Sequence, residues 1–218
     1  MKVDWSRIEP AVFFSSAAVV VFVLAFGVID PDGAKDTFLG LQNWIVGTFG
    51  WLFVASTAFF LVFSVWCTLG ARGRLRLGPE GEPPDFALHS WFAMLFSAGM
   101  GIGIMFFGVA EPVMHYASPP SAAVGSPLAA QQAMTITFFH WGLHAWGVYT
   151  VMGLAIAYFG HRKGLPLAIR STLYPLLGNR IHGWIGHSVD TFAVFGTIFG
   201  LATSLGLGAM QINAGLHR

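Results

Sequence analysis

The placement of charged residues constrains this chain more than any other feature of its sequence. Charged side chains leave five uncharged windows, at residues 10–29, 37–71, 86–110, 112–161 and 191–217. The shortest window has 20 residues, and a helix that crosses a lipid bilayer needs about 20 mostly apolar residues. We therefore predict an all-α membrane protein rather than a soluble domain.

The composition excludes several other classes of protein. The net charge of +1 provides no basic surface for nucleic acid, so we expect no nucleic-acid partner. Cys67 is the only cysteine, which excludes a disulfide scaffold. A porin-like barrel would show alternating segments of about ten residues instead of long apolar blocks.

Five transmembrane helices are predicted, at about residues 11–29, 45–68, 88–109, 133–159 and 190–216. The first could instead be a cleaved signal peptide, but the apolar stretch of a signal runs to about 7–15 residues, so an uncleaved helix is favoured. We expect the semi-apolar segment 160–189 to lie along the cytoplasmic interface as short helices. The chain stops without a polar tail, so we also expect it to be truncated.

The basic residues predict the orientation of these helices. Lys2 and Arg7 precede the first helix, three arginines follow the second, and four basic residues between 162 and 180 follow the fourth. The two alternate loops, 30–44 and 110–132, hold a single basic residue between them, Lys35. Because short cytoplasmic loops are enriched in Lys and Arg, we predict a cytoplasmic N-terminus.

Three glycines alternate within the third predicted helix, at Gly99, Gly101 and Gly103. Alternate residues do not share one helical face, and each glycine costs about 1 kcal/mol against alanine in a helix interior. This favours a locally unwound helix, of the kind that forms ion and substrate sites in secondary transporters. A close helix crossing through small residues is the alternative.

The fourth predicted helix carries Trp141, Trp146 and Tyr149, which fall within an arc of about 140° on a helical wheel. Faces of electron-rich rings suit a quaternary ammonium group, which offers no N–H donor for selection by hydrogen bonds. An aromatic belt at the membrane interface is the alternative interpretation.

Histidines in the same region raise the question of a metal or haem. His140 and His144 are four residues apart, but no cysteine or carboxylate lies near them in the sequence to complete a site. Packed, hydrogen-bonded histidines are therefore favoured. Glu111, directly before Pro112, is interpreted as a helix-end or gate residue rather than a proton carrier.

Hydroxyl side chains mark the fifth predicted helix. Thr197 and Ser204 are seven residues apart and share a face, and hydroxyl oxygens can bind a hard cation such as Na⁺. The alternative is hydrogen bonding between helices or to the carbonyls of their own helix, which is favoured for Thr203.

Three blocks of this sequence resemble the betaine/choline/carnitine transporters. They are Ala98–Pro112 (AGMGIGIMFFGVAEP), Phe139–Tyr149 (FHWGLHAWGVY) and Phe199–Gly208 (FGLATSLGLG). The resemblance covers residues 11–218 but only the N-terminal part of a family member. It implies a partial leucine-transporter-like inverted-repeat fold, with two leading helices followed by the first three helices of repeat one, in a single transporter domain.

The resemblance also implies roles for individual residues. The substrate-binding positions that it assigns are Trp141, Trp146, Tyr149, Met100 and Phe106. It implies that Ser97 and Met100 give backbone carbonyls to Na⁺, and that Thr197 supplies a hydroxyl to a second sodium site. Leu201 replaces a hydroxyl that some sodium-coupled members have, which weakens the case for that second site. Gly103 stands where proton-coupled choline-type members resemble one another in having an aspartate, which favours Na⁺ as the coupling ion.

The function that the resemblance implies is secondary active transport, not enzyme catalysis. The substrates would be quaternary ammonium osmolytes such as glycine betaine, choline or carnitine, carried across the cell membrane with Na⁺ and without a cofactor. Membrane lipid and a homotrimer are the other implied partners, and we expect the truncated chain to be inactive alone. Two alternatives remain open: a helical redox subunit with His115, His140 and His144 as haem ligands, and a structural membrane subunit.

Overall fold

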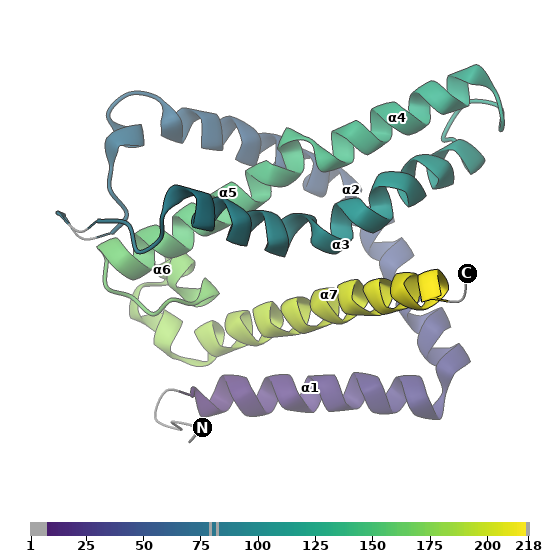
Figure 1. Cartoon of the computed structure of the whole chain (residues 1–218). Helices are drawn as coiled ribbons and strands as arrows, with labels where there is room; N and C mark the ends of the chain where they lie inside the picture. The colour runs from purple at the N-terminus through teal and green to yellow at the C-terminus, as the bar shows by residue number, and fades with distance from the viewer. Residues whose placement is uncertain (1–7, 79, 82, 217–218) are drawn as a thin grey trace. The chain divides into compact units, whose positions relative to one another are not determined.

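The computed structural model describes residues 8–78, 80–81 and 83–216, with residues 98–102 described by their backbone alone. This part of the chain is helical and contains no strand, which confirms the all-α class (Figure 1). Among the described residues, four helical segments are long and apolar enough to cross a membrane: Pro10–Ile29, Pro31–Thr68, Pro127–Arg162 and Trp184–Leu216. The predicted third span, 88–109, lies on a further helix, α3 (Leu88–Ala117).

The apolar side chains of these helices are largely exposed. In the described part of the chain, the buried apolar residues are Ala34, Ala129, Ala133 and Ile181. Large side chains such as Phe22 are exposed, by 69% in that case. A surface of this kind is stable only in an apolar environment, as expected for helices that contact lipid or other transmembrane helices. The chain is therefore a membrane protein.

The chain divides into two compact units. The first unit comprises the residues up to 79 together with 149–198. The second unit comprises residues 80–148 together with those from 199 onward.

In the first unit, α1 (Pro10–Ile29) and α2 (Pro31–Thr68) are joined by a single residue, Asp30. The Asp30 carboxylate accepts a hydrogen bond of 3.0 Å from the backbone N–H of Gly33 and so caps α2. Pro31 fits the first position of the helix, where no N–H is needed. The prediction of a loop at 30–44 is therefore wrong, because this cap starts the second helix about fourteen residues early.

A run of short helices connects the fourth and fifth predicted spans. It consists of η3 (Tyr158–Arg162), η4 (Ile169–Leu173), α6 (Tyr174–Leu177) and η5 (Gly178–His182). Gly164 and Gly178 adopt positive φ angles of 66° and 55°, which side chains disfavour. The long helix α7 (Trp184–Leu216) then begins six residues before the predicted start at 190.

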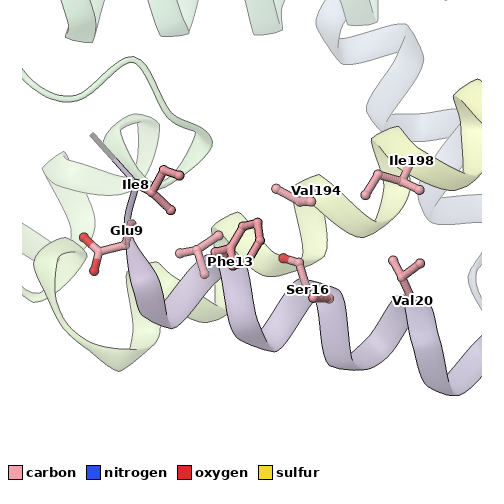
Figure 2. A pocket seen from close by; sticks show the side chains of 9 residues that line it. Ile8, Glu9, Phe13, Ser16, Val20, Val194 and Ile198 are labelled. Atoms are coloured by element: carbon pink, nitrogen blue, oxygen red, sulfur yellow. The ribbon is translucent and has the colours of Figure 1, made fainter. Parts of the chain in front are cut away.

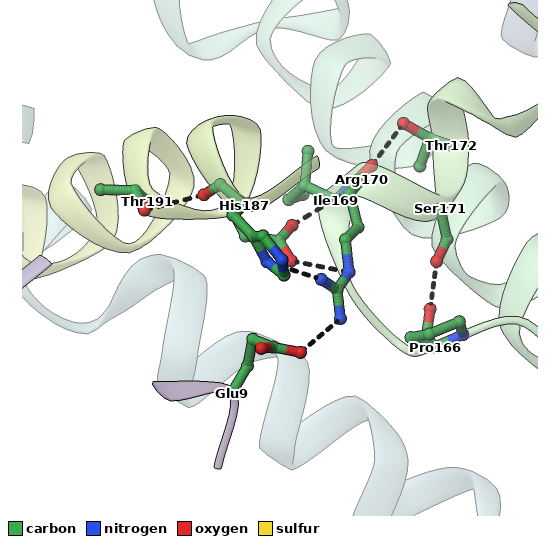
Figure 3. Close-up of polar contacts among 9 residues, drawn as sticks. Glu9, Pro166, Ile169, Arg170, Ser171, Thr172, His187 and Thr191 are labelled. Carbon is green, nitrogen blue, oxygen red and sulfur yellow. Dashed lines mark hydrogen bonds and ion pairs between the residues drawn. The ribbon is translucent and has the colours of Figure 1, made fainter. Parts of the chain in front are cut away.

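A buried arginine ties this run of helices to α1 and α7 (Figure 3). Arg170 is 9% exposed, and its backbone N–H donates to Asp190 Oδ1 at 2.9 Å. Its guanidinium lies 3.2 Å from Asp190 Oδ2, 3.2 Å from His187 Nδ1 and 3.7 Å from Glu9 Oε2. One side chain therefore holds together the beginning of α1, η4 and the beginning of α7.

An apolar cavity of about 410 Å³ lies between α1 and the first half of α7 (Figure 2). Ser16 is 5% exposed there, and its hydroxyl finds no hydrogen-bond partner among the described residues. The neighbouring Ser15 joins the two helices through a contact of 2.7 Å with the hydroxyl of Thr191. None of the predicted substrate-binding residues lines this cavity.

In the second unit, α3 packs along α4 (Pro127–Trp141). Ser126 caps α4 by accepting a hydrogen bond of 3.1 Å from the N–H of Ala129, and Pro127 follows it. The helix therefore starts six residues before the predicted residue 133. At the other end, α3 continues through Pro112 to Ala117, which corrects the expected end of the third span at 109.

The fourth predicted span is divided at Gly142. There α4 ends, and α5 (Leu143–Ala157) begins at the next residue. Gly142 has a ψ angle of −158°, outside the helical region, and a Cβ at this position would lie 2.5 Å from the backbone oxygen of Phe138. Only glycine fits this break without displacement of the chain.

Candidate substrate-binding site

Glu111, in the last two turns of α3, forms the centre of a polar cluster with the end of α4. It is 6% exposed. Its Oε1 lies 2.8 Å from His140 Nδ1 and 3.5 Å from His115 Nε2. Its Oε2 accepts a hydrogen bond of 2.6 Å from the indole nitrogen of Trp141. The carboxylate is thus satisfied from two sides, as a buried charge must be.

The indole of Trp141 is also fixed at its carbon edges. A Cβ at Gly103 would lie 3.1 and 3.2 Å from two carbons of the six-membered ring, so this ring packs directly on the glycine of α3. The ring of Phe107 lies 6.1 Å away, tilted by 35°. Trp141 is therefore held at its nitrogen by Glu111 and at its opposite edge by α3, and it remains partly exposed.

The other two predicted aromatic residues lie beyond the break at Gly142. Trp146 and Tyr149 are on α5, with exposed fractions of 40% and 71%. The predicted arc assumed a single helix from Trp141 to Tyr149, and the interruption removes that angular relation for Trp141. Trp146 and Tyr149 remain one turn apart on one helix. The convergence of all three residues in one aromatic box stays a prediction.

The glycine stretch is helical in this structure, whereas the sequence favoured a locally unwound segment. The backbone of α3 is continuous through Gly99, Gly101 and Gly103. The direct packing of Gly103 on Trp141 instead matches the alternative interpretation, a close helix crossing through small residues. The side chain of Met100 lies outside the described residues. Phe106 is half-buried, with its ring 5.0 Å from that of Phe107.

The hydroxyls near the predicted sodium sites bond to their own helices. Ser97 donates to the backbone oxygen of Ala93 at 2.7 Å, and Thr197 donates to that of Ala193 at 2.8 Å. Thr203 does the same with Phe199 at 2.9 Å, as predicted. These bonds use the hydroxyl hydrogens and leave oxygen lone pairs free. The assignment of Ser97, Met100 and Thr197 to Na⁺ stays a prediction.

The sequence did not reveal the joint role of Glu111 and His140. His140 is hydrogen-bonded, as expected, but its partner is 29 residues away in the chain. The sequence did contain a signal for this pairing, because Glu111 stands next to an apolar window and a buried carboxylate needs hydrogen-bond donors. The adjacent residues His140 and Trp141 supply two such donors. In the part of the chain that the structure describes, no group of three His, Cys, Asp or Glu side chains is arranged to hold a metal ion.

These observations define a helical membrane protein with a fixed, partly exposed indole where two of its helices cross. The chain belongs to the betaine/carnitine/choline family of transporters, because the model of that family matches residues 11–218.

Individual relatives agree with this assignment. The chain is 51% identical to the glycine betaine transporter of Acinetobacter baylyi over 98% of its own length and 32% of that protein. It is 47% identical to the glycine betaine transporter OpuD of Bacillus subtilis, covering 95% of the chain and 41% of the relative. It is also 47% identical to the high-affinity choline transport protein of Escherichia coli K12, covering 96% and 31%. The chain thus spans about a third to two fifths of the length of these relatives.

Proposed function

We propose that this chain forms part of a secondary transporter for quaternary ammonium compounds such as glycine betaine, choline or carnitine. The structural observation that carries the proposal is the fixed indole of Trp141, since ring faces bind a cation that has no N–H donor. The family assignment and relatives named as glycine betaine and choline transporters support the same substrate class. In this proposal Trp146 and Tyr149 complete one wall of the aromatic site.

Na⁺ is the coupling ion that we propose. Gly103 carries no carboxylate and lies in tight contact with the Trp141 ring, which argues against a proton carrier at this position. In a continuous helix the carbonyls of Ser97 and Met100 bond to amides four residues ahead. Cation binding by these carbonyls therefore requires α3 to open locally, and the glycines at 99, 101 and 103 make such opening less costly than alanines would.

Transport would proceed by alternating access, with a cytoplasmic N-terminus, in the plasma membrane. The five-span count, the inverted-repeat architecture and a homotrimer belong to the same proposal. No bond is made or broken in this process, so the protein's role is to bind the cation, to exclude water from it and to change conformation.

A chimera tests the proposal directly. This chain replaces the matching 32% of the Acinetobacter baylyi transporter, to which it is 51% identical. Uptake of radiolabelled glycine betaine and choline is then measured in cells without their own uptake systems. We expect saturable uptake of at least one substrate, dependent on external Na⁺. Uptake that persists without Na⁺ and collapses with a protonophore would contradict the proposed coupling, and a lack of competition by quaternary ammonium compounds would contradict the substrate class.

A further inference from the structure

The hydrogen bond between Glu111 and Trp141 uses a charged acceptor where packing alone would be served by a neutral one. An indole N–H can be satisfied by any neutral acceptor, such as a backbone carbonyl or a glutamine oxygen. Here the acceptor is a carboxylate that is 6% exposed, although burial of a charged group costs far more than burial of a neutral one. The charge of Glu111 therefore needs an explanation beyond the hydrogen bond itself.

The two oxygens of Glu111 have separate partners. Oε1 is held by His140 at 2.8 Å, with His115 at 3.5 Å, and these contacts fix the plane of the carboxylate. Oε2 is thereby left to Trp141, at 2.6 Å. A hydrogen bond to an ionised carboxylate is stronger than one to a neutral acceptor. The two histidines orient the acceptor, and the acceptor orients the indole.

A carboxylate on the indole nitrogen also changes the ring. Donation of a hydrogen bond to an anion polarises the N–H group and shifts electron density into the π system. The attraction between a cation and a ring face is electrostatic and grows with that density. Gly103 complements this arrangement, because the absence of a side chain lets the six-membered ring rest against α3.

We propose that Glu111 is a positioning residue that sets both the orientation of the Trp141 indole and the strength with which its face attracts a quaternary ammonium group. The inference rests on the proposed substrate class. Glu111 acts through Trp141, so its effect on binding requires the indole nitrogen. The binding of neutral ligands of the same shape does not depend on Glu111.

The first measurement uses the 218-residue chain, with the indole nitrogens labelled for NMR in detergent. In the variant Glu111→Gln the side chain keeps its size and an acceptor oxygen but loses its charge. We expect the indole proton resonance assigned to Trp141, through its loss in Trp141→Phe, to move upfield. The control Asp36→Asn removes an exposed carboxylate from α2 and should leave this resonance unchanged. An unchanged resonance in Glu111→Gln would overturn the proposal.

The second measurement is a double-mutant cycle in the chimera. It compares the binding of choline with that of 3,3-dimethyl-1-butanol, a neutral alcohol of the same shape. We expect Glu111→Gln to weaken choline binding at least threefold in the wild-type background and to change it little in Trp141→Phe. Binding of the neutral alcohol should not respond. If Glu111→Gln weakens choline binding equally in both backgrounds, Glu111 does not act through Trp141, and only this inference is overturned. If Trp141→Phe binds choline like the wild type, the aromatic site itself is misplaced, and the inference fails with it.

Discussion

Trp146 is the residue at which the two interpretations of the aromatic residues differ most clearly. Trp141 is anchored at its nitrogen by Glu111, whereas Trp146 is 40% exposed on the far side of the break at Gly142. A residue of an interfacial belt meets lipid headgroups and contributes little to substrate affinity. A residue of a binding site loses a desolvated contact with the cation when it is removed.

We expect Trp146→Ala in the chimera to weaken the binding of glycine betaine or choline by about 1–2 kcal/mol, as the loss of a cation–π contact would. Trp146→Phe keeps a ring and should have a smaller effect. Dissociation constants from competition uptake give the comparison. Trp51, which is 71% exposed on α2, provides the control, and Trp51→Ala should leave affinity unchanged. If the two alanine variants behave alike, Trp146 belongs to the belt.

Arg170 leads to a prediction about stability. Its removal leaves Asp190, which is 9% exposed, without its cationic partner. Since a buried charge that has lost its partner costs about 3–5 kcal/mol, Arg170→Met should lower the free energy of unfolding by that amount. Denaturant titration of the chain in detergent measures the change. The control Arg180→Met, at an exposed position, should stay within about 0.5 kcal/mol.

A neutral replacement of both partners separates charge from packing. The double variant Arg170→Met/Asp190→Leu removes the two charges together and should recover part of the lost stability. If it is less stable than Arg170→Met alone, the hydrogen bond from the Arg170 backbone to Asp190 is the more important contact.

Among the elements, α3 combines a continuous helix with a sequence that weakens it. Its glycines at 99, 101 and 103 each cost the helix about 1 kcal/mol relative to alanine. We have proposed that local opening of this helix frees carbonyls for Na⁺. A substitution that stabilises the helical form should therefore oppose cation binding.

We expect Gly101→Ala in the chimera to raise the Na⁺ concentration needed for half-maximal uptake about fivefold, since about 1 kcal/mol of added helix stability has to be overcome. The control is Gly47→Ala on α2, where a Cβ meets nothing within 4 Å. Gly47→Ala stabilises its helix by the same amount, but α2 is not proposed to open. The Na⁺ dependence of uptake by this variant should therefore equal that of the wild type. Equal responses of the two variants would contradict opening at α3.

The helical class could be predicted from the sequence, but several helix ends could not. Long uncharged windows leave few alternatives to apolar helices, so the four apolar segments lie close to predicted spans. The polar residues Asp30 and Ser126 were interpreted as parts of loops, although each is a cap that starts a helix. The break at Gly142 was missed because a single glycine is tolerated within a helix, and the close approach of a Cβ at this position to Phe138 depends on the local backbone.

The candidate site was predictable residue by residue but not in its connections. Trp141 stands out in the sequence as part of a dense aromatic stretch. Its bond to Glu111 joins positions 30 residues apart and depends on how α3 crosses α4. The same crossing explains Gly103, which the alternating glycine pattern alone assigned to an unwound helix.

For the molecule as a whole, the loop charges predict one orientation across the membrane. The basic residues predict a cytoplasmic N-terminus. A reporter active only outside the cytoplasm should therefore be active when fused after residue 125, between α3 and α4. It should be inactive when fused after residue 165, between η3 and η4. A fusion after residue 78 provides the matched cytoplasmic control. Activity at 165 or its absence at 125 would contradict the orientation.

The unequal lengths of the first two helices determine how the protein responds to bilayer thickness. With 20 residues, α1 is about 30 Å long, whereas α2, with 38 residues, is about 57 Å long. A hydrocarbon core of about 30 Å matches α1 from end to end, and α2 has to tilt or extend into the headgroups. Because the two helices meet at Asp30, α2 can adjust to a thicker membrane by changing its tilt, but α1 has no spare turn. Thickening of the membrane therefore acts on this protein first through α1.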